Sequence, residues 1–99
     1  MYKPISHKLY ILVDKTLKPS QQAVQACHAA IEFAKAYPDW KHESLVLLGV
    51  SCERELLDYY KRILGGYMRT AFVEPHWDNR MTAIACYGCD EYVTDLNLI

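Results

Sequence analysis

Two uninterrupted apolar runs most constrain the fold of this chain, because each is followed by a segment with helical periodicity. The runs KLYILVDK (8–15) and SLVLLGVS (44–51) have the length and the aliphatic content typical of strands that are covered on both faces. Long helical crossovers after two such strands place the helices on the faces of a sheet. We therefore expect a sheet with helices packed against it.

The segment from Gln21 to about Tyr37 is predicted to form the first helix. Ser20 before it is a good N-cap, because its hydroxyl can accept a hydrogen bond from an amide of the first turn, and Pro38 ends the helix. Most of the circumference is apolar, which predicts wide burial. The polar residues fall on one stripe, at Gln21, Gln25, His28, Glu32 and Lys35.

A second helix is expected after Ser51, which can cap it, and is predicted to end at Gly65 and Gly66. Residues 67–74 and 81–88 are predicted strands, and the six residues PHWDNR between them favour an antiparallel hairpin. The tail from residue 89 is either a turn of helix or a further strand. The prediction is one α/β domain over residues 1–99, with a mixed four-stranded sheet and the order βαβαββ.

The charge of the chain is balanced overall but uneven along it. The formal net charge of −1 excludes the strongly basic class of nucleic-acid-binding protein. Residues 1–42 carry six lysines against three acids, whereas residues 43–99 carry five basic residues against nine acids. A phosphate site is therefore expected near Lys15 and Lys18, where the free amides of the first helix add to the charge. Surface lysines otherwise serve mainly solubility.

Cysteine usage and the N-terminus indicate a cytoplasmic protein. The apolar run Leu9–Val13 is too short for a signal peptide or a membrane span, so no membrane partner is expected. The pair Cys86 and Cys89 forms a lone CxxC that closes a strand, whereas redox pairs usually begin a helix. A zinc site would need two further ligands, from His7, His42 or His76, which nothing in the sequence brings close. No metal and no cofactor are expected.

Several segments together resemble the type 2 peptidyl-tRNA hydrolases, and most of all the divergent branch of peptidyl-tRNA hydrolase domain-containing proteins. They are KLYILVDKTLK, QACHAA, SLVLLGVS and TAFVEPHWDNRMTAIAC, in this order, and they span about residues 8–88. The resemblance implies a small α/β fold. It also implies an enzyme that cleaves the ester between a peptide and the 3′ ribose of tRNA, in the cytoplasm and without a metal.

Part of the family's site can be carried over to this chain. In the family, a lysine at the start of the first helix, an acid and a threonine after the third strand, and a threonine that opens the fourth strand line the site. Thr82 matches the last of these, and Gln25 and His28 match the pattern of the first helix.

Other parts of the family's site depart from the pattern. Gln21 stands where the lysine is expected, so that Lys18 in the preceding loop is the substitute, although the two positions are not equivalent. The family's acidic loop is absent, so Glu74 or Asp78 would supply its carboxylate.

Two hypotheses of different classes follow. The first is an esterase acting on peptidyl- or aminoacyl-tRNA, since ester hydrolysis needs a base and a group that stabilises the oxyanion. Its candidate catalytic residues are Lys18, Gln21, Glu74, Asp78 and Thr82. The second is an inactive member of the fold that binds RNA ends or a small nucleotide. Its candidate binding residues are Lys15, Lys18, Gln25, His28 and Trp77. A homodimer, formed through a strand edge or the aromatic surface, is compatible with both.

Two of these residues have a second interpretation. His28 is either a general base or a structural histidine that hydrogen-bonds Gln25 one turn earlier, and we favour the structural role. Trp77 in the hairpin turn either stacks on a base or folds back over the sheet.

Overall fold

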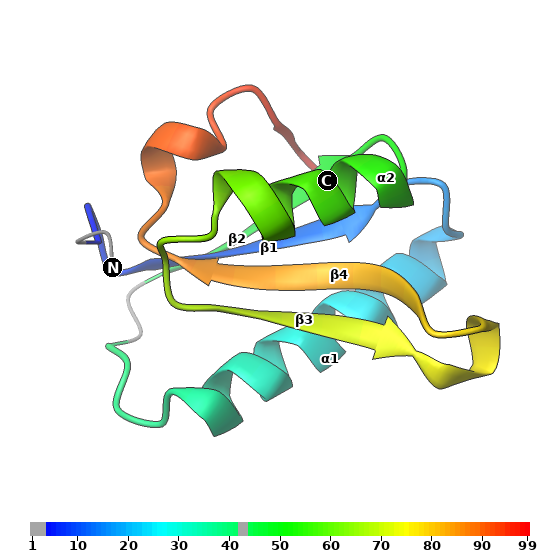
Figure 1. Cartoon of the computed structure of the whole chain (residues 1–99), viewed down its shortest axis with the longest axis horizontal. Helices are drawn as coiled ribbons and strands as arrows, with labels where there is room; N and C mark the ends of the chain where they lie inside the picture. The colour runs from blue at the N-terminus through cyan, green and yellow to red at the C-terminus, as the bar shows by residue number, and fades with distance from the viewer. Residues whose placement is uncertain (1–3, 42–43) are drawn as a thin grey trace.

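Five strands form one mixed sheet in the computed structural model, which describes residues 4–41 and 44–99. The sheet has the order β3-β4-β1-β2-β5; β1 and β2 are parallel, and the other neighbours are antiparallel (Figure 1). The strands are β1 (Lys8–Asp14), β2 (Ser44–Val50), β3 (Arg69–Glu74), β4 (Arg80–Tyr87) and β5 (Asn97–Leu98).

The predicted four-stranded sheet with the order βαβαββ is therefore wrong by one strand. The tail first makes a short 3-10 turn, η3 (Asp90–Tyr92), and then adds β5 at the edge beside β2. Both residues of β5 are exposed, so the strand carries no alternation of buried and exposed side chains that a sequence pattern could reveal.

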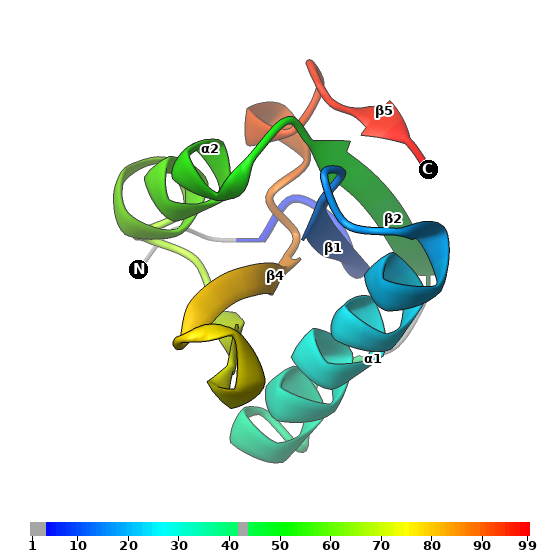
Figure 2. The same ribbon diagram turned by 90° about the vertical axis from the view of Figure 1, so that its right-hand side faces the viewer.

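The two faces of the sheet are covered by different helices. Helix α1 (Pro19–Ala36) lies on one face, and α2 (Glu53–Asp58) with the π-helical η1 (Tyr59–Ile63) lies on the other (Figure 2). The predicted single α/β domain with helices packed on a mixed sheet is confirmed. Within the described part of the chain, no helix is long and apolar enough to cross a lipid bilayer.

Helix α1 begins earlier than predicted. Lys18 is the N-cap residue and Pro19 occupies the first helical position, where its missing amide hydrogen costs nothing. Ser20 therefore lies inside the helix and is not the cap. The side chain of Gln21 takes over part of the capping, because its Oε1 accepts a hydrogen bond from the Lys18 amide at 3.1 Å.

The predicted wide burial of α1 is also wrong. Only Gln25, Ala26, Ala29 and Phe33 are buried, whereas the side chains of Val24 and Ile31 are more than half exposed. The reason is geometric: a helix that lies on a sheet buries one side, and within the described residues no further layer covers the other side.

The second helix changes its period part of the way along. Cys52, and not Ser51, is its N-cap residue, and the Ser51 hydroxyl instead hydrogen-bonds the Glu55 carboxylate at 2.5 Å. From Tyr59 the backbone hydrogen bonds change to the π pattern, in which an amide donates to the carbonyl five residues earlier. The Leu64 amide thus donates to the Tyr59 carbonyl at 2.8 Å. Tyr59 and Leu64 are both buried.

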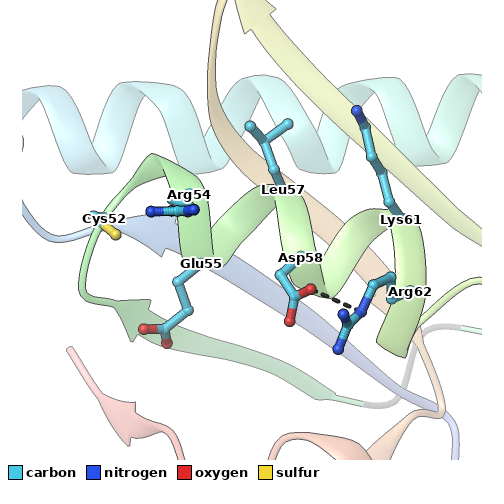
Figure 3. A pocket seen from close by; sticks show the side chains of 7 residues that line it. All are labelled: Cys52, Arg54, Glu55, Leu57, Asp58, Lys61 and Arg62. Carbon is cyan, nitrogen blue, oxygen red and sulfur yellow. Dashed lines mark ion pairs between the residues drawn. The ribbon is translucent and has the colours of Figure 1, made fainter.

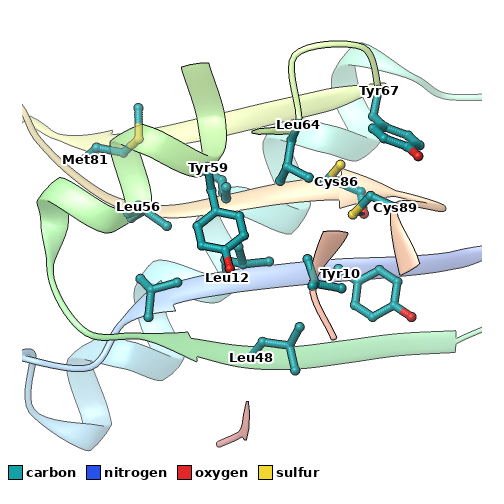
Figure 4. Packing of buried hydrophobic residues seen from close by; sticks show 13 residues of the cluster. Tyr10, Leu12, Leu48, Leu56, Tyr59, Leu64, Tyr67, Met81, Cys86 and Cys89 are labelled. Atoms are coloured by element: carbon teal, nitrogen blue, oxygen red, sulfur yellow. Dashed lines mark hydrogen bonds between the residues drawn. The ribbon is translucent and has the colours of Figure 1, made fainter. Parts of the chain in front are cut away.

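The core lies in two layers, one on each side of the sheet. The layer under α1 contains Phe33 with the small side chains of Ala29, Ala83 and Ala85, which let the helix approach the sheet closely. The layer under α2 and η1 holds larger side chains and is drawn in Figure 4. It includes Tyr10, Leu12, Leu48, Leu56, Tyr59, Leu64, Met81, Ile84 and Cys86.

A β-bulge interrupts the hairpin of β3 and β4, which is otherwise antiparallel as predicted. Phe72 pairs with Ala83 but Val73 pairs with Met81, so Thr82 is one extra residue on β4. Ala83 belongs to the core layer under α1, and Thr82 hydrogen-bonds α1 as well. The bulge thus turns two neighbouring side chains to the same face, which sets the geometry of the site described next.

Candidate functional site

Polar side chains gather at one edge of the sheet. Strands β1, β2 and β3 run in the same direction, so their carboxyl ends lie at this edge together with the start of β4. The 3-10 turn η2 (Pro75–Trp77) and the first turns of α1 lie there too (Figure 1). Open α/β sheets bind ligands at the carboxyl ends of their strands, so this edge is the natural place to look for a site.

Gln25 links three elements through its amide. Its Nε2 donates to Oε2 of Glu74 at 3.1 Å, and its Oε1 accepts from the Thr82 hydroxyl at 2.7 Å. Thr82 is completely buried, while Gln25 and Glu74 are 4% and 9% exposed. The Thr82 hydroxyl therefore fixes the amide of Gln25, and the amide in turn holds one oxygen of Glu74.

The other oxygen of Glu74 is held by His76. Oε1 of Glu74 accepts from the His76 backbone amide at 3.2 Å and lies 2.8 Å from Nδ1 of the His76 ring. These hydrogen bonds, first that of the imidazole and then those of the amide and of Gln25, lower the pKa of Glu74. Glu74 is thus ionised at neutral pH with both oxygens engaged. We call Gln25, Glu74, His76 and Thr82 the glutamate network.

A second group of side chains surrounds a buried acid at the end of β1. Arg80 donates from Nη2 to Oδ2 of Asp14 and to the Thr16 hydroxyl, the latter at 2.9 Å. Oδ1 of Asp14 accepts from the Thr16 amide at 2.8 Å and from its hydroxyl at 2.7 Å. Asp14 is completely buried, whereas about a third of the Arg80 side chain is exposed. We call these three residues the arginine network.

Opposing effects set the ionisation of Asp14. Burial alone would raise the pKa of its carboxyl group, but the hydrogen bonds from Thr16 and Arg80 outweigh burial and lower it. The guanidinium of Arg80 is therefore held in place by a partner that is ionised at neutral pH. Its Nε is buried and has no hydrogen-bond partner among the described residues, so the group is not fully satisfied by the protein.

The structure brings several predicted site residues to this edge. Gln25, Glu74 and Thr82 are in direct contact. Asp78 follows η2 and is exposed, with a positive φ of 57° that an aspartate tolerates in a turn. Trp77 is partly exposed in the same turn. These positions agree with the predicted polar turn between the two strands.

Lys18 is the N-cap residue of α1, about two turns before Gln25, and Gln21 lies in the first turn, about one turn before Gln25. Lys18 is exposed, whereas the side-chain oxygen of Gln21 is engaged in capping the helix. The structure therefore places these two residues at the same end of the molecule as Thr82, through the shared helix.

Lys15 and His28 point elsewhere. The stem of Lys15 lies against Gly49 of β2, where a Cβ atom would be only 2.4 Å from it. The ring of His28 stacks on Phe72 at 4.2 Å between centroids. The predicted hydrogen bond between His28 and Gln25 is wrong, because the Gln25 amide is used for Glu74 and Thr82. A charged ligand would meet Lys15 over β2, away from Glu74.

Besides His76, which the sequence suggested only as a possible zinc ligand, three residues of this edge were missed as site residues by sequence reasoning. Asp14 carried a usable signal, since an acid that ends an otherwise apolar strand is either solvated or paired. Thr16 and Arg80 carried none, because only the pairing of β1 with β4 brings them to Asp14.

One hollow, of about 240 Å³, is lined by His28 together with apolar residues of α1 and Cys27. Another, of about 570 Å³, holds none of the predicted site residues and lies over the outer side of α2 and η1, where Asp58 and Arg62 form an exposed ion pair at 2.9 Å (Figure 3). Within residues 4–41 and 44–99, no three His, Cys, Asp or Glu side chains are close enough together to hold a metal ion. His42, considered above as a zinc ligand, lies outside the described residues.

The sequence was also compared with known proteins. No model of a known protein family matches the chain. No curated protein matches it either.

Proposed function

We propose that this protein is a divergent peptidyl-tRNA hydrolase-like enzyme that cleaves the ester between a peptide or aminoacyl group and the 3′ ribose of tRNA. The observation that carries the proposal is the buried contact of Gln25 with Glu74 and Thr82. It joins three of the positions that the resemblance pointed to, from three different elements. A cytoplasmic location, where tRNA is found, would fit this activity.

The chemistry of ester hydrolysis can be assigned to groups at this edge. The reaction needs a base to activate water and positive charge or hydrogen-bond donors to stabilise the oxyanion. The ionised Glu74 belongs to the groups that support activation of the water. Two cations are available to stabilise the oxyanion. Arg80, fixed by Asp14, supplies the positive charge that Gln21 lacks, and exposed Lys18 lies at the start of α1.

The first test is hydrolysis of labelled N-acetyl-aminoacyl-tRNA by the full chain. We expect the wild type to release the acyl group, and Lys18→Ala and Thr82→Val each to lower kcat/KM by about tenfold to a hundredfold. Lys18→Ala removes a cation, and Thr82→Val removes the hydroxyl that fixes the Gln25 amide. The matched control is Thr94→Val, an exposed threonine of the tail, which should turn over like the wild type.

The outcomes separate the enzyme from its assigned site. Equal turnover by the wild type, Lys18→Ala and Thr82→Val would contradict the site residues but not the activity. Absence of acyl release from the wild type would contradict the activity itself.

One observation favours the second hypothesis, a protein that binds RNA ends or a nucleotide without chemistry. The Thr82 hydroxyl is completely buried and the side-chain oxygen of Gln21 caps a helix, so neither is free to contact a substrate in this conformation. This protein would bind uncharged and acylated tRNA equally well and release nothing. Binding would weaken with salt, because phosphate contacts by Lys15 and Lys18 displace counterions.

Self-association stays a prediction for either hypothesis. Val24 and Ile31 on α1 and Leu45 on β2 are each more than half exposed, which supplies apolar surface for a contact between copies. Sedimentation velocity over a range of concentrations would measure the mass in solution.

A further inference from the structure

The best-placed base at the polar edge is a histidine that the sequence did not single out for catalysis. His76 lies in η2 with 89% of its side chain exposed, and its Nδ1 is 2.8 Å from Oε1 of Glu74. We propose that His76 is the general base that activates the hydrolytic water and that Glu74 is the residue that positions it. This inference rests on the hydrolase function proposed above.

The hydrogen bonds around Glu74 fix which ring nitrogen carries the proton. The carboxylate of Glu74 is ionised and can only accept hydrogen bonds, so the ring nitrogen that faces it must donate. In the neutral imidazole the proton therefore resides on Nδ1, and Nε2 keeps a free lone pair. With so little of the side chain buried, Nε2 can accept a proton from a water molecule.

Glu74 is itself held still, so the histidine has a fixed support. Its Oε2 is bound by Gln25, which is fixed by the buried hydroxyl of Thr82. Its Oε1 also accepts from the His76 amide, which anchors the backbone of the turn to the same carboxylate. A carboxylate that sets the tautomer and orientation of a histidine is a recurrent device in hydrolases.

The other candidate bases are less suitable. Both oxygens of Glu74 are engaged in hydrogen bonds, which lowers its power as a proton acceptor. Asp78 is exposed, and His28 is stacked on Phe72. Of these four residues, only His76 combines a free lone pair with a positioning partner.

The proposed step balances without a further reactant. The water oxygen forms a bond to the ester carbonyl carbon while one water proton moves to Nε2 of His76. The resulting oxyanion then collapses, the bond between the carbonyl carbon and the 3′ oxygen breaks, and the imidazolium returns its proton to that oxygen. The products are the free 3′ hydroxyl and the peptide acid, which loses its proton to solvent.

The test combines removal of the ring with chemical rescue, again on N-acetyl-aminoacyl-tRNA. We expect His76→Ala to lower kcat by about a hundredfold or more, with a small change in KM, as is typical for the loss of a general base. Because the site of the ring is open to solvent, added imidazole should restore part of the lost kcat in a saturable manner. Glu74→Gln should lower kcat without rescue by imidazole, because its histidine is still present.

The matched control is His7→Ala. His7 is also exposed and also has its Nδ1 in a hydrogen bond, to the Tyr87 hydroxyl at 2.5 Å, but it precedes β1 at the opposite edge of the sheet. We expect wild-type turnover from this variant and no effect of imidazole. Wild-type turnover by His76→Ala, or loss of turnover without any rescue, would overturn the role of His76 while the hydrolase function stands. An inactive wild type would overturn the hydrolase function and this step with it.

A second readout does not depend on turnover. Nitrogen chemical shifts of ¹⁵N-labelled histidine at a pH where the ring is neutral should show His76 protonated on Nδ1, and this preference should weaken in Glu74→Gln. A ring protonated on Nε2 in the wild type would overturn the inference whatever the activity.

Discussion

At the scale of single residues, the polar edge is stabilised by ionised side chains that have few alternative hydrogen-bond partners. Asp14 is completely buried, and its two oxygens are taken up by Thr16 and Arg80. A buried carboxylate is costly to leave without partners, so this acid ties the loop after β1 to the first residue of β4. The same residue is expected to make the stability of the protein depend on pH.

Asp14→Asn is expected to reduce the free energy of unfolding at pH 7 by about 1 to 3 kcal/mol, because the amide nitrogen or oxygen cannot replace an ionised acceptor of three hydrogen bonds. The native pKa of Asp14 lies below its ordinary value of 3.8, so its contribution is complete above that value and is lost as the pH falls through the lowered pKa. Urea unfolding of the wild type from pH 7 down to acid pH should therefore show stability falling below about pH 4.

The variant should show a shallower fall over the same range. Glu74, whose pKa is also lowered, contributes with the same sign and remains in the variant, so the pH dependence does not vanish. Asp39→Asn, which changes an exposed acid, is the control and should leave the curve unchanged. Identical pH dependence in the wild type and Asp14→Asn would contradict the role given to Asp14.

At the scale of elements, the start of α1 is stabilised by a capping contact between the Lys18 amide and the Gln21 side chain. We expect Gln21→Ala to cost about 0.5 to 1 kcal/mol of stability in thermal or urea unfolding, since the Lys18 amide loses its acceptor. Gln21→Glu keeps the acceptor and adds a negative charge at the helix N-terminus, so it should be neutral or slightly stabilising. Ser20→Ala should also be close to neutral, because Ser20 is not the cap. A larger loss for Ser20→Ala than for Gln21→Ala would contradict this assignment.

The same elements show what sequence reasoning can and cannot reach. The strands β1 and β2 were correctly predicted because each is a continuous apolar run, the first helix because its polar residues recur at helical spacing, and the hairpin of β3 and β4 because its turn is short and polar. The cap of α1, the π-helical end of the second helix and β5 were not, since each depends on one or two hydrogen bonds that leave no periodic pattern.

For the site, the sequence identified Gln25, Glu74 and Thr82 individually, and the structure brings them into contact. It did not identify the pairing of Asp14 with Arg80, because these residues are far apart in the chain and only the neighbouring positions of β1 and β4 join them. Contacts between strands distant in sequence are set by the whole sheet, and a single sequence carries no local mark of them.

At the scale of the whole molecule, the four cysteines differ in how far the fold must open before a reagent can reach their thiols. Cys27 is exposed and Cys52 partly exposed, whereas Cys86 and Cys89 are completely buried and all four are free. The hydrogen bond with Cys89, together with burial, raises the pKa of the Cys86 thiol, so it has little thiolate character.

In the native protein, we expect a thiol reagent such as Ellman's reagent to modify Cys27 rapidly and Cys52 more slowly. Cys86 and Cys89 should react only at the rate of global unfolding, since the sheet must open to expose them. Mass spectrometry of the labelled peptides distinguishes the four sites, and urea provides the fully reactive reference. Rapid labelling of Cys86 or Cys89 in native buffer would contradict their burial.

The bulge at Thr82 has a consequence for which sequence changes in β4 the protein can accept during evolution. The single extra residue separates the stretch of β4 that serves the polar edge from the stretch that packs between the helices. Substitutions from Ala83 onward can adjust the interior while leaving the hydrogen bonds of the polar edge unchanged. Loss of the residue before Thr82 would instead turn its hydroxyl to the opposite face of the sheet, and Gln25 would lose this hydrogen bond.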